Sequence, residues 1–448
     1  MTTNYRYHII LPDLDTKSIL AIQTEEGKWS LPSIVPEEYH FTNALHINTK
    51  VKELLKIDTN LLYCSYYDRD QDSQQVEAGY ILERRNNNGH IPDNCRWVHL
   101  NDLEKVELIN PKNLTAIRNY FAEQTLDDWG RPQWAREGWL RSAAEWIEER
   151  LLARGVELAG PVRQVKSWSM SSVLRAETSI GDVYLKALPD IFQHEPALTK
   201  YLSTHYPEHI PHILAVNEEE NWMLTEDFDA PFLYQEDDWS RWEEILELYA
   251  RIQIEQVNNI DRLLELGCPD RRMPMLIEQI DEISANLSRI ATDRDFSLTD
   301  NEIEEWHQVV PELKQACHQL DQCNIPDTLE HGDFYVANIA SIRDRTIFFD
   351  WTDGCISHPF FSLIPFFSEG DYSREIKESL ITAYLNPWTD MAEMERLKYI
   401  FKLAQRVGEI HTAWTYYKIV TNAPDKSSWE REWVFPVCIR YVLREFSR

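Results

Sequence analysis

The stretch LEHGDFYVANIASIRDRTIFFDWTDGCISHPF, from Leu329 to Phe360, restricts the fold more than any other part of the chain. Asp333 and Asn338 lie close together in a short loop, and Asp350 follows at the end of an apolar strand. Phosphoryl transfer needs one carboxylate to accept the proton of the acceptor hydroxyl, and an amide oxygen with a second carboxylate to hold Mg²⁺ against the ATP phosphates. The three side chains therefore predict a phosphoryl-transfer site. The alternative is a chance HGD tripeptide and an Asp350 that only caps a strand.

Two segments of this stretch resemble a known superfamily. HGDFYVANI is similar to the HGDxxxxNI catalytic loop of the aminoglycoside phosphotransferase and choline kinase superfamily, and FFDWTDGCISHPF is similar to its IDW...GxP segment. The resemblance implies that Asp333 is the catalytic base, that Asn338 and Asp350 are the Mg²⁺ ligands, and that His331 is a buried organiser of the loop. Ser362 departs from the family pattern, because a structural Asp of a D-L-A triplet usually stands there.

The length of 448 residues indicates more than one domain, since hydrophobic cores stop growing near roughly 250 to 300 residues. Near the N-terminus, the segments RYHIILPDL, SILAIQT, LLYCSYYDR and VEAGYILERR predict strands. TNALHINTKVKELLKI has helical spacing, with Leu45, Val51, Leu54 and Leu55 on or near one face. A second helix is expected from about Pro111 through LTAIRNYFAEQ.

Further along, TLDDWGRPQWAREG predicts a connector that packs on a neighbour, and WLRSAAEWIEERLLARG predicts an amphipathic helix. The runs QVKSWSMSSVLRAETS and DVYLKAL predict paired strands, and beyond Glu236 the pattern is mainly helical, with one strand-like segment, TIFFDW. We therefore expect an α+β chain with a bilobal protein-kinase-like fold. Its predicted parts are a small α/β domain at 1–123, a connector at 124–138, an N-lobe at 139–230 and a mostly helical C-lobe at 231–448.

A kinase-like N-lobe holds the nucleotide. Lys186 in VYLKAL lies on a predicted strand, where a kinase lysine pairs with the α- and β-phosphates of ATP. Glu195, in the predicted helix HEPALTKYL, would complete the ion pair of that lysine. The alternative for Lys186 is a solvated strand lysine.

Two further segments are predicted to contact ATP. SWSMSS lies where the phosphate-covering loop is expected; it has no glycine, but backbone N–H groups and the hydroxyls of Ser169 and Ser171 can cradle phosphate oxygens. WMLTEDF resembles the hinge of the family, whose backbone near Glu226 and Phe228 would meet the adenine edge. An ordinary hairpin tip and a plain buried strand are the alternatives.

The acceptor pocket would be formed after Asp350. That part of the chain contains carboxylates and aromatic rings suited to an amine-bearing substrate: Asp353, Glu369, Asp371, Glu409, Trp414 and Tyr417. A solvated face or a core position is the alternative for each. An aminoglycoside, choline, a sugar amine and a homoserine-like acceptor all stay open as substrates.

Charge and composition exclude several classes of partner. A formal net charge of −30 disfavours nucleic acids and anionic membrane surfaces and favours a cationic small molecule. No apolar run approaches the roughly 20 residues that cross a bilayer, and no secretory signal is visible, so a cytoplasmic protein is expected. The seven cysteines are scattered without a CxxC pair, which argues against a disulfide framework and against a structural zinc site.

The N-terminal region resembles a Nudix domain through KWSLP and CRWVHLNDL. A Nudix enzyme needs the helix box REUxEExG, whose carboxylates bind the metal that activates water. The corresponding helix offers only Glu53, so the resemblance implies a non-catalytic relative. Ligand binding, packing on the kinase lobe and formation of a homodimer are the open roles.

The leading hypothesis is a kinase of a small hydroxylated molecule that uses ATP and Mg²⁺. A catalytically silent ligand- or nucleotide-binding pseudoenzyme of the same fold is the alternative, and Nudix-type hydrolysis is opposed by the missing carboxylates.

Overall fold

The computed structural model describes residues 4–37, 40–70, 74–86, 91–126, 130–228, 239–290, 297–342, 345–368, 372–422, 429–431 and 433–446. The protein is α+β, as expected, and forms two compact units. Unit 1 consists of Met1–Pro189, Trp222–Glu226 and Pro424–Trp429, and unit 2 of Asp190–Asn221, Asp227–Ala423 and Glu430–Arg448. Residue 123, the predicted end of the first domain, lies inside unit 1.

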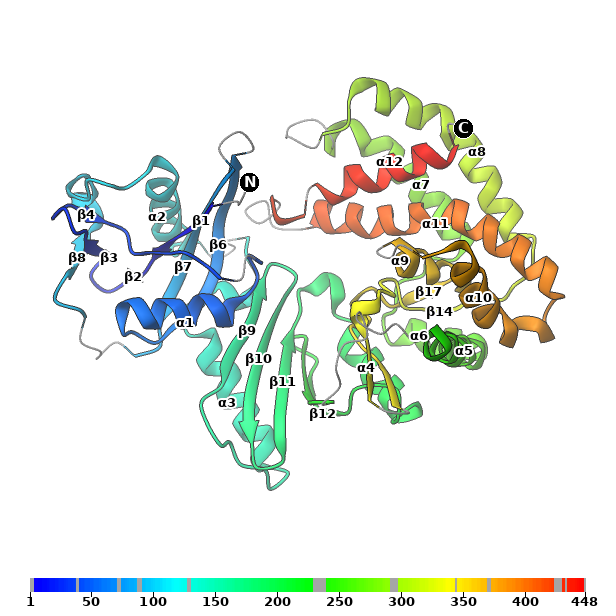
Figure 1. The fold of residues 1–448 in the computed structure, drawn as a ribbon, viewed down its shortest axis with the longest axis horizontal. Helices are drawn as coiled ribbons and strands as arrows, with labels where there is room; N and C mark the ends of the chain where they lie inside the picture. The colour runs from blue at the N-terminus through cyan, green and yellow to red at the C-terminus, as the bar shows by residue number, and fades with distance from the viewer. Residues whose placement is uncertain are drawn as a thin grey trace. The chain divides into compact units, whose positions relative to one another are not determined.

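The N-terminal half of unit 1 contains two sheets and two helices (Figure 1). One sheet has the strand order β5-β1-β7-β6, and in the other β3 pairs with β2, β4 and β8. The pairing of β1 with β7 is parallel, whereas the other pairings are antiparallel. The elements are β1 (Asn4–Ile10), β2 (Pro12–Asp13), β3 (Ser18–Gln23), β4 (Trp29–Ser30), β5 (Ser33–Ile34), α1 (Ala44–Leu55), β6 (Thr59–Asp70), β7 (Gln75–Arg84), β8 (Cys95–His99), η1 (Leu100–Lys105) and α2 (Pro111–Glu123).

Helix α1 begins where the Asn43 side chain accepts a hydrogen bond from the His46 backbone N–H at 3.1 Å. Its buried face is Ala44, Ile47, Val51 and Leu55. Leu54, which was expected on or near this face, is 39% exposed and lies next to the buried Leu55. The buried positions recur every three or four residues, as expected for one face of a helix.

The second half of unit 1 is a helix and four strands of a further sheet. The strands follow the order β13-β11-β10-β9, and each neighbouring pair is antiparallel. The predicted strand run 164–179 is split into two strands by a turn at Ser169 and Met170. The elements are η2 (Gln133–Ala135), α3 (Trp139–Leu152), β9 (Arg163–Trp168), β10 (Ser171–Thr178), β11 (Gly181–Ala187) and β13 (Trp222–Glu226).

Hydrogen bonds join the two halves of unit 1. The buried Gln164 side chain of β9 donates to the Leu61 carbonyl of β6 and accepts from the Leu61 N–H, both at 2.9 Å. Ser167 N–H donates to the Thr42 carbonyl at 3.0 Å. A side-chain amide that satisfies both backbone groups of one residue fixes the relative position of the two segments. The N-terminal region is therefore docked onto this sheet.

Unit 2 is mainly helical, as predicted for the C-terminal part (Figure 1). Its short strands pair as β14 with β17 and β15 with β16. The helices are α4 (Glu195–His205), α5 (Trp239–Gln256), α6 (Ile260–Glu265), α7 (Met273–Ile290), α8 (Asp300–Asp321), α9 (Leu363–Ser368), α10 (Arg374–Leu385), α11 (Met394–Asn422) and α12 (Val434–Phe446). The strands are β12 (Ile213–Asn217), β14 (Thr328–Glu330), β15 (Ile339–Ile342), β16 (Arg345–Phe348) and β17 (Cys355–Ser357). Short 3₁₀ turns are η3 (Asp190–Phe192), η5 (Val257–Asn259), η6 (Val336–Asn338), η7 (Trp351–Asp353), η8 (Pro359–Phe361) and η9 (Asn386–Asp390).

An aromatic group in the core of unit 2 supports the loop after β14. The rings of Tyr249 and Phe334 stack with centroids 4.0 Å apart, and Phe348 packs 5.5 Å from Tyr249. All three side chains are fully buried. Rigid rings beneath the loop restrict its backbone, which is a requirement for a site that must hold its groups in fixed positions.

None of the helices in the described part of the chain is both long and apolar enough to cross a bilayer.

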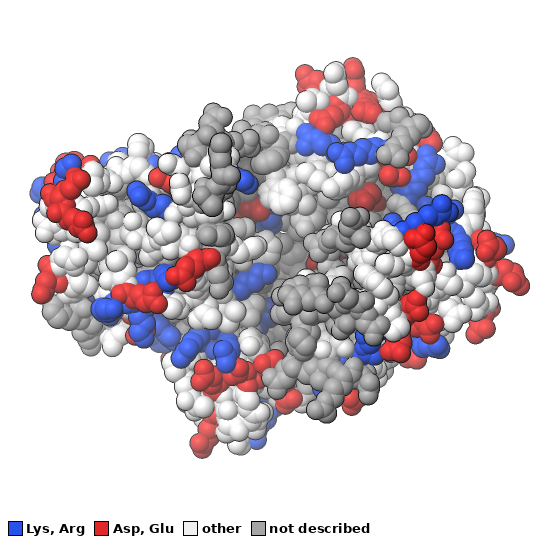
Figure 2. Space-filling view, in the orientation of Figure 1, with Lys and Arg blue, Asp and Glu red and all other residues white. Residues whose placement is uncertain are grey.

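Lys and Arg side chains are interspersed with Asp and Glu on the face drawn in Figure 2. Six of the seven cysteines are buried, and all seven are free thiols.

Candidate active site

The loop from His331 to Asn338 turns sharply at Gly332, whose φ is +77°. A Cβ atom at Gly332 would lie 2.2 Å from the Asp353 carbonyl oxygen, so the loop touches the turn that follows Asp350. Two backbone hydrogen bonds then close the loop. Tyr335 N–H donates to the Asp333 carbonyl at 2.8 Å, and Asn338 N–H donates to the Tyr335 carbonyl at 2.9 Å. A glycine is required here for both its φ and its lack of a side chain.

Asn338 is hydrogen-bonded to Asp333. Its Nδ2 group donates to the Asp333 carbonyl at 2.8 Å and to Asp333 Oδ2 at 2.9 Å. Because both bonds come from the amide nitrogen, the amide oxygen of Asn338 keeps its acceptor capacity for another group. Asp333 is half-buried and is held in a fixed orientation by its neighbour.

A β-hairpin returns the chain from Asn338 to Asp350. The register of β15 and β16 pairs Ile339 with Phe348, and Phe349 N donates to the Asn338 carbonyl at 3.1 Å. The buried His331 adds a second link, because its Nε2 atom lies 3.0 Å from the Phe349 carbonyl oxygen. The structure thus brings Asp333, Asn338 and the residue before Asp350 together within one unit.

Asp350 has an unusual backbone, with φ 62° and ψ 61°. Left-handed residues other than glycine are uncommon, although Asp tolerates this region, and they cluster at functional sites. Its carboxylate contacts a hydroxyl, because Asp350 Oδ1 lies 2.5 Å from Thr352 Oγ1. The same hydroxyl lies 2.8 Å from Oε2 of the fully buried Glu195, at the start of α4.

Since a hydroxyl has one proton, it cannot donate to both carboxylates at the same moment. Thr352 therefore links the Asp350 carboxyl group to Glu195. The donor set of Asp350 and the Asn338 amide oxygen consists of hard oxygen atoms, and it fits Mg²⁺.

The Tyr416 hydroxyl of α11 is close enough to Asp333 and Asp353 for the charges of both to act on it. Burial, followed by the charges of Asp333 and Asp353, raises the pKa of the Tyr416 hydroxyl well above its usual value. A protonated phenol near two carboxylates can donate a hydrogen bond to a substrate or to a carboxylate. The predicted substrate residue Asp353 is half-buried against Gly332.

The predicted ATP-binding residues are divided between the units. Lys186 lies on β11, opposite Val173 of β10 and Met223 of β13, and Ser171 accepts a hydrogen bond from the Trp168 indole at 2.9 Å. Ser169 lies in the turn before Ser171. These residues and Glu226, the last residue of β13, belong to unit 1.

Glu195 and Phe228 belong to unit 2. The Phe228 ring packs 5.1 Å from the ring of Phe349, immediately before Asp350. Lys186 and Glu195 lie in different units, so their ion pair stays a prediction. The chain passes from unit 1 to unit 2 between Glu226 and Asp227, inside the segment predicted to be the hinge.

The remaining predicted substrate residues are less informative. Glu369 and Asp371 lie outside the described residues. Trp414 is buried and stacks on Tyr417 with centroids 5.0 Å apart, and the Tyr417 hydroxyl donates to Glu282 of α7 at 3.1 Å. These two rings therefore join α11 to α7 in the helical core.

Glu409 is half-buried on α11. Burial and the carboxylate of Glu445 on α12 raise the pKa of Glu409 from 4.5 to about 7. The folded chain therefore binds a proton that the unfolded chain has released between these two values, and the free energy of unfolding falls as the pH rises through this range.

We expect Glu409→Gln to remove this part of the pH dependence, because an amide does not titrate. Between pH 5 and pH 8, the free energy of unfolding of the wild type should fall by roughly 2–3 kcal/mol more than that of the variant. Urea unfolding at the two pH values measures the difference. The exposed Glu395→Gln on the same helix is the control and should follow the wild type; equal pH dependence in all three proteins would contradict the assignment.

Sequence reasoning missed Thr352 and Tyr416. Thr352 follows the recognised Asp350-Trp351 pair, so its position two residues after a predicted metal ligand was the available signal. Tyr416 lies between Trp414 and Tyr417, but no periodicity distinguishes the ring that faces the loop from the rings that face the core.

No protein-family model matches the chain, and no curated protein matches it significantly. Solved structures of small-molecule phosphotransferases are distantly similar. A choline/ethanolamine kinase family protein from Mesorhizobium loti is 17% identical over 68% of this chain and 97% of its own, with a TM-score of 0.44. A macrolide 2'-phosphotransferase type I is 13% identical over 65% and 96%, with a TM-score of 0.47. A spectinomycin phosphotransferase, solved with ADP and spectinomycin, is 12% identical over 67% and 98%, with a TM-score of 0.44.

Proposed function

We propose that the chain is an ATP-dependent phosphotransferase that transfers the γ-phosphate to a hydroxyl of a small, amine-bearing molecule. The observation that carries the proposal is the hydrogen bond from Asn338 Nδ2 to the Asp333 carboxylate at 2.9 Å, next to a hairpin that returns to Asp350. A fixed carboxylate beside an amide oxygen and a second carboxylate is the group set that transfer to an alcohol requires.

Asp333 is proposed to accept the proton of the acceptor hydroxyl. Asn338 orients this carboxylate by donating to Oδ2 at 2.9 Å. The backbone beneath the carboxylate is anchored by the stacked rings of Tyr249 and Phe334. The contact of His331 with the Phe349 carbonyl is proposed to hold the loop that contains Asp333 next to the strand end that precedes Asp350.

The Asn338 amide oxygen and the Asp350 carboxylate are proposed to hold Mg²⁺. When bound, this ion would neutralise the charge of the ATP phosphates. Thr352 orients the Asp350 carboxylate through the 2.5 Å contact to Oδ1. The nucleotide contacts that we propose are those expected from the sequence: Lys186, Glu195, Ser169, Ser171, Glu226 and Phe228.

An amine-bearing acceptor is favoured by the charge near Asp333. Asp353, whose backbone lies against Gly332, adds a second carboxylate, and the Tyr416 phenol is close enough to Asp333 and Asp353 for their charges to act on it. Carboxylates and aromatic faces together bind ammonium groups through charge and cation–π attraction. The net charge of −30 acts in the same direction over a longer range.

We further propose that the N-terminal region is a non-catalytic Nudix-like domain.

The test is incubation of the purified protein with Mg·ATP and a panel of aminoglycosides, amino alcohols, amino sugars and neutral sugars. ADP release and ³¹P NMR of the products should show a phosphate monoester on at least one amine-bearing member. If the nucleotide binds but no acceptor is phosphorylated, the pseudoenzyme alternative replaces the proposal. If only neutral sugars react, phosphoryl transfer to a hydroxyl is supported, but the proposed amine-bearing substrate class is wrong.

We expect Thr352→Val to weaken the response to Mg²⁺. Val keeps the shape of the side chain but removes the hydroxyl that contacts Asp350. Loss of such an outer contact typically weakens metal binding by roughly 10-fold or more, so the Mg²⁺ concentration for half-maximal activity should rise by about that factor. Thr352→Ser keeps the hydroxyl and is the matched control. An unchanged Mg²⁺ titration in Thr352→Val would exclude this role.

A further inference from the structure

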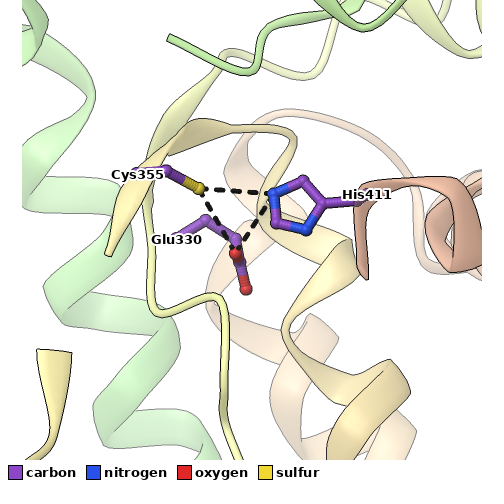
Figure 3. A group of neighbouring side chains, drawn as sticks. All are labelled: Glu330, Cys355 and His411. Atoms are coloured by element: carbon purple, nitrogen blue, oxygen red, sulfur yellow. Dashed lines mark hydrogen bonds and ion pairs between the residues drawn. The ribbon is translucent and has the colours of Figure 1, made fainter. Parts of the chain in front are cut away.

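Three metal-ligating side chains of different chemistry meet behind the catalytic loop. Glu330 ends β14, Cys355 begins β17, and His411 comes from α11 (Figure 3). The register of the strand pair places Glu330 directly opposite Cys355. Their exposed fractions are 1%, 0% and 3%. Among the described residues, they form the one group of three or more such side chains whose ligand atoms all lie within 4.8 Å of one another.

The three ligand atoms are spaced as three of the four corners of a tetrahedral zinc coordination shell. Cys355 Sγ lies 3.3 Å from His411 Nε2 and 3.6 Å from Glu330 Oε2, and the nitrogen and oxygen atoms are 3.7 Å apart. Zinc bonds of about 2.3 Å to sulfur and about 2.0–2.2 Å to nitrogen and oxygen give tetrahedron edges of roughly 3.3–3.6 Å. The observed spacings agree with these edges within a few tenths of an ångström.

We propose that Glu330, Cys355 and His411 bind one Zn²⁺ ion. Thiolate and imidazole ligands favour a borderline ion such as Zn²⁺ and disfavour Mg²⁺, which prefers oxygen ligands. The site is distinct from the proposed Mg²⁺ site, and it does not depend on the proposed function. The ion would join α11 to β17 and to β14, which ends immediately before the loop from His331 to Asn338.

The charges around the cluster are compatible with the ion. The buried guanidinium of Arg271 acts on all three ligands and favours their deprotonated forms, in which they bind metals. Burial has the opposite effect on the acids: it raises the pKa of Glu330 to about 7 and raises the pKa of Cys355 well above its usual value.

Hydrogen bonds orient the ligands from outside. Ser362 Oγ donates to Glu330 Oε1 at 2.9 Å, which leaves Oε2 directed toward the thiol and the imidazole. Tyr249 lies 2.9 Å from the same Ser362 hydroxyl. Such outer contacts fix the direction of metal ligands in known sites. Ser362 is also the residue that replaces the structural Asp of the family pattern.

The spacing of the cysteines argued against a zinc site, and the structure explains why the ligands were not recognised. Cys355 is separated from Glu330 by 25 positions and from His411 by 56 positions. Only one ligand is a cysteine, and no short motif unites three ligands from two strands and a distant helix.

The experiment is metal analysis of the full chain, purified in the presence of ZnCl₂ and then dialysed against metal-free buffer. We expect about one zinc per chain for the wild type and a loss of most of it in Cys355→Ser. The buried Cys317→Ser on α8 is the matched control and should keep its zinc. Asp350→Asn should also keep it, which separates this site from the proposed Mg²⁺ site.

Replacement of zinc by Co²⁺ gives a readout that needs no variant. The wild type loaded with Co²⁺ should show a thiolate-to-Co²⁺ charge-transfer band and the visible bands of a tetrahedral ion. Cys355→Ser should lose the charge-transfer band, and Cys317→Ser should keep it. A wild type that retains no zinc and shows no such band overturns the proposal and leaves the cluster as a network of hydrogen bonds.

Discussion

Replacement of Asp333 by Asn should lower kcat/KM for phosphoryl transfer by a factor of roughly 10² to 10⁴, the usual effect of losing a positioned base. Asn has the same shape as Asp but cannot take the proton of the acceptor hydroxyl. It also replaces the carboxylate that accepts from Asn338 Nδ2 at 2.9 Å. Coupled detection of ADP, with the acceptor identified from the panel, measures the change.

The exposed Asp390→Asn, in the 3₁₀ turn η9, is the matched control and should retain the activity of the wild type. Nucleotide binding should survive in Asp333→Asn, because the proposed metal ligands are unchanged. If Asp333→Asn transfers phosphate as fast as the wild type, Asp333 is not the base.

Gly332→Ala should lower the free energy of unfolding of unit 2 by roughly 2–5 kcal/mol. This estimate adds the cost of a left-handed backbone at a non-glycine residue to the cost of overpacking. Its new Cβ would lie 2.2 Å from the Asp353 carbonyl oxygen and 2.5 Å from the Asp353 Cβ. Both contacts are to atoms near the backbone, which cannot rotate away. The loop must therefore move from the turn after Asp350, and activity should fall at least as strongly as stability. Urea unfolding and the transfer assay measure the two effects.

Gly267→Ala separates the two causes. Gly267 also has a left-handed φ, of +87°, but its nearest neighbouring atom would be 3.5 Å away, an ordinary contact. The control should lose only roughly 1–2 kcal/mol of stability and keep its activity. If the two alanine variants are equally stable and equally active, the close approach of the loop to Asp353 is not a constraint.

The core of the candidate site was predictable because its residues lie in one short stretch. The Asp333–Asn338 contact spans a single loop, and the hairpin that follows must return the chain close to its starting point. Local sequence therefore determines which groups meet. The long amphipathic helices of unit 2 were predictable for a similar reason, since their period is visible in any window.

Contacts between distant segments were not predictable. The Thr352 hydroxyl meets Glu195 across 157 positions, and Gln164 meets Leu61 across 103. Neither pair has a periodicity or a spacing rule that could indicate it. The width of a buried face is also set by packing: Leu54 of α1 is 39% exposed although its neighbour Leu55 is fully buried.

The division of the chain was only partly visible in the sequence. Composition suggested a boundary near residue 123, but Gln164 and Ser167 hydrogen-bond to the N-terminal region and make both halves one compact unit. The chain passes from unit 1 into unit 2 between Glu226, the last residue of β13, and Asp227. The independence of residues 1–123 as a domain therefore stays a prediction.

Calorimetric titration of a non-hydrolysable ATP analogue, with and without Mg²⁺, tests the central claim most directly because it needs no knowledge of the acceptor. The wild type should bind the analogue at least about 10-fold more tightly with Mg²⁺, and Asp350→Ala should lose that advantage. No nucleotide binding in the wild type, or an equal Mg²⁺ effect in Asp350→Ala, would contradict the assignment of Asp350 and Asn338 to a metal-nucleotide site.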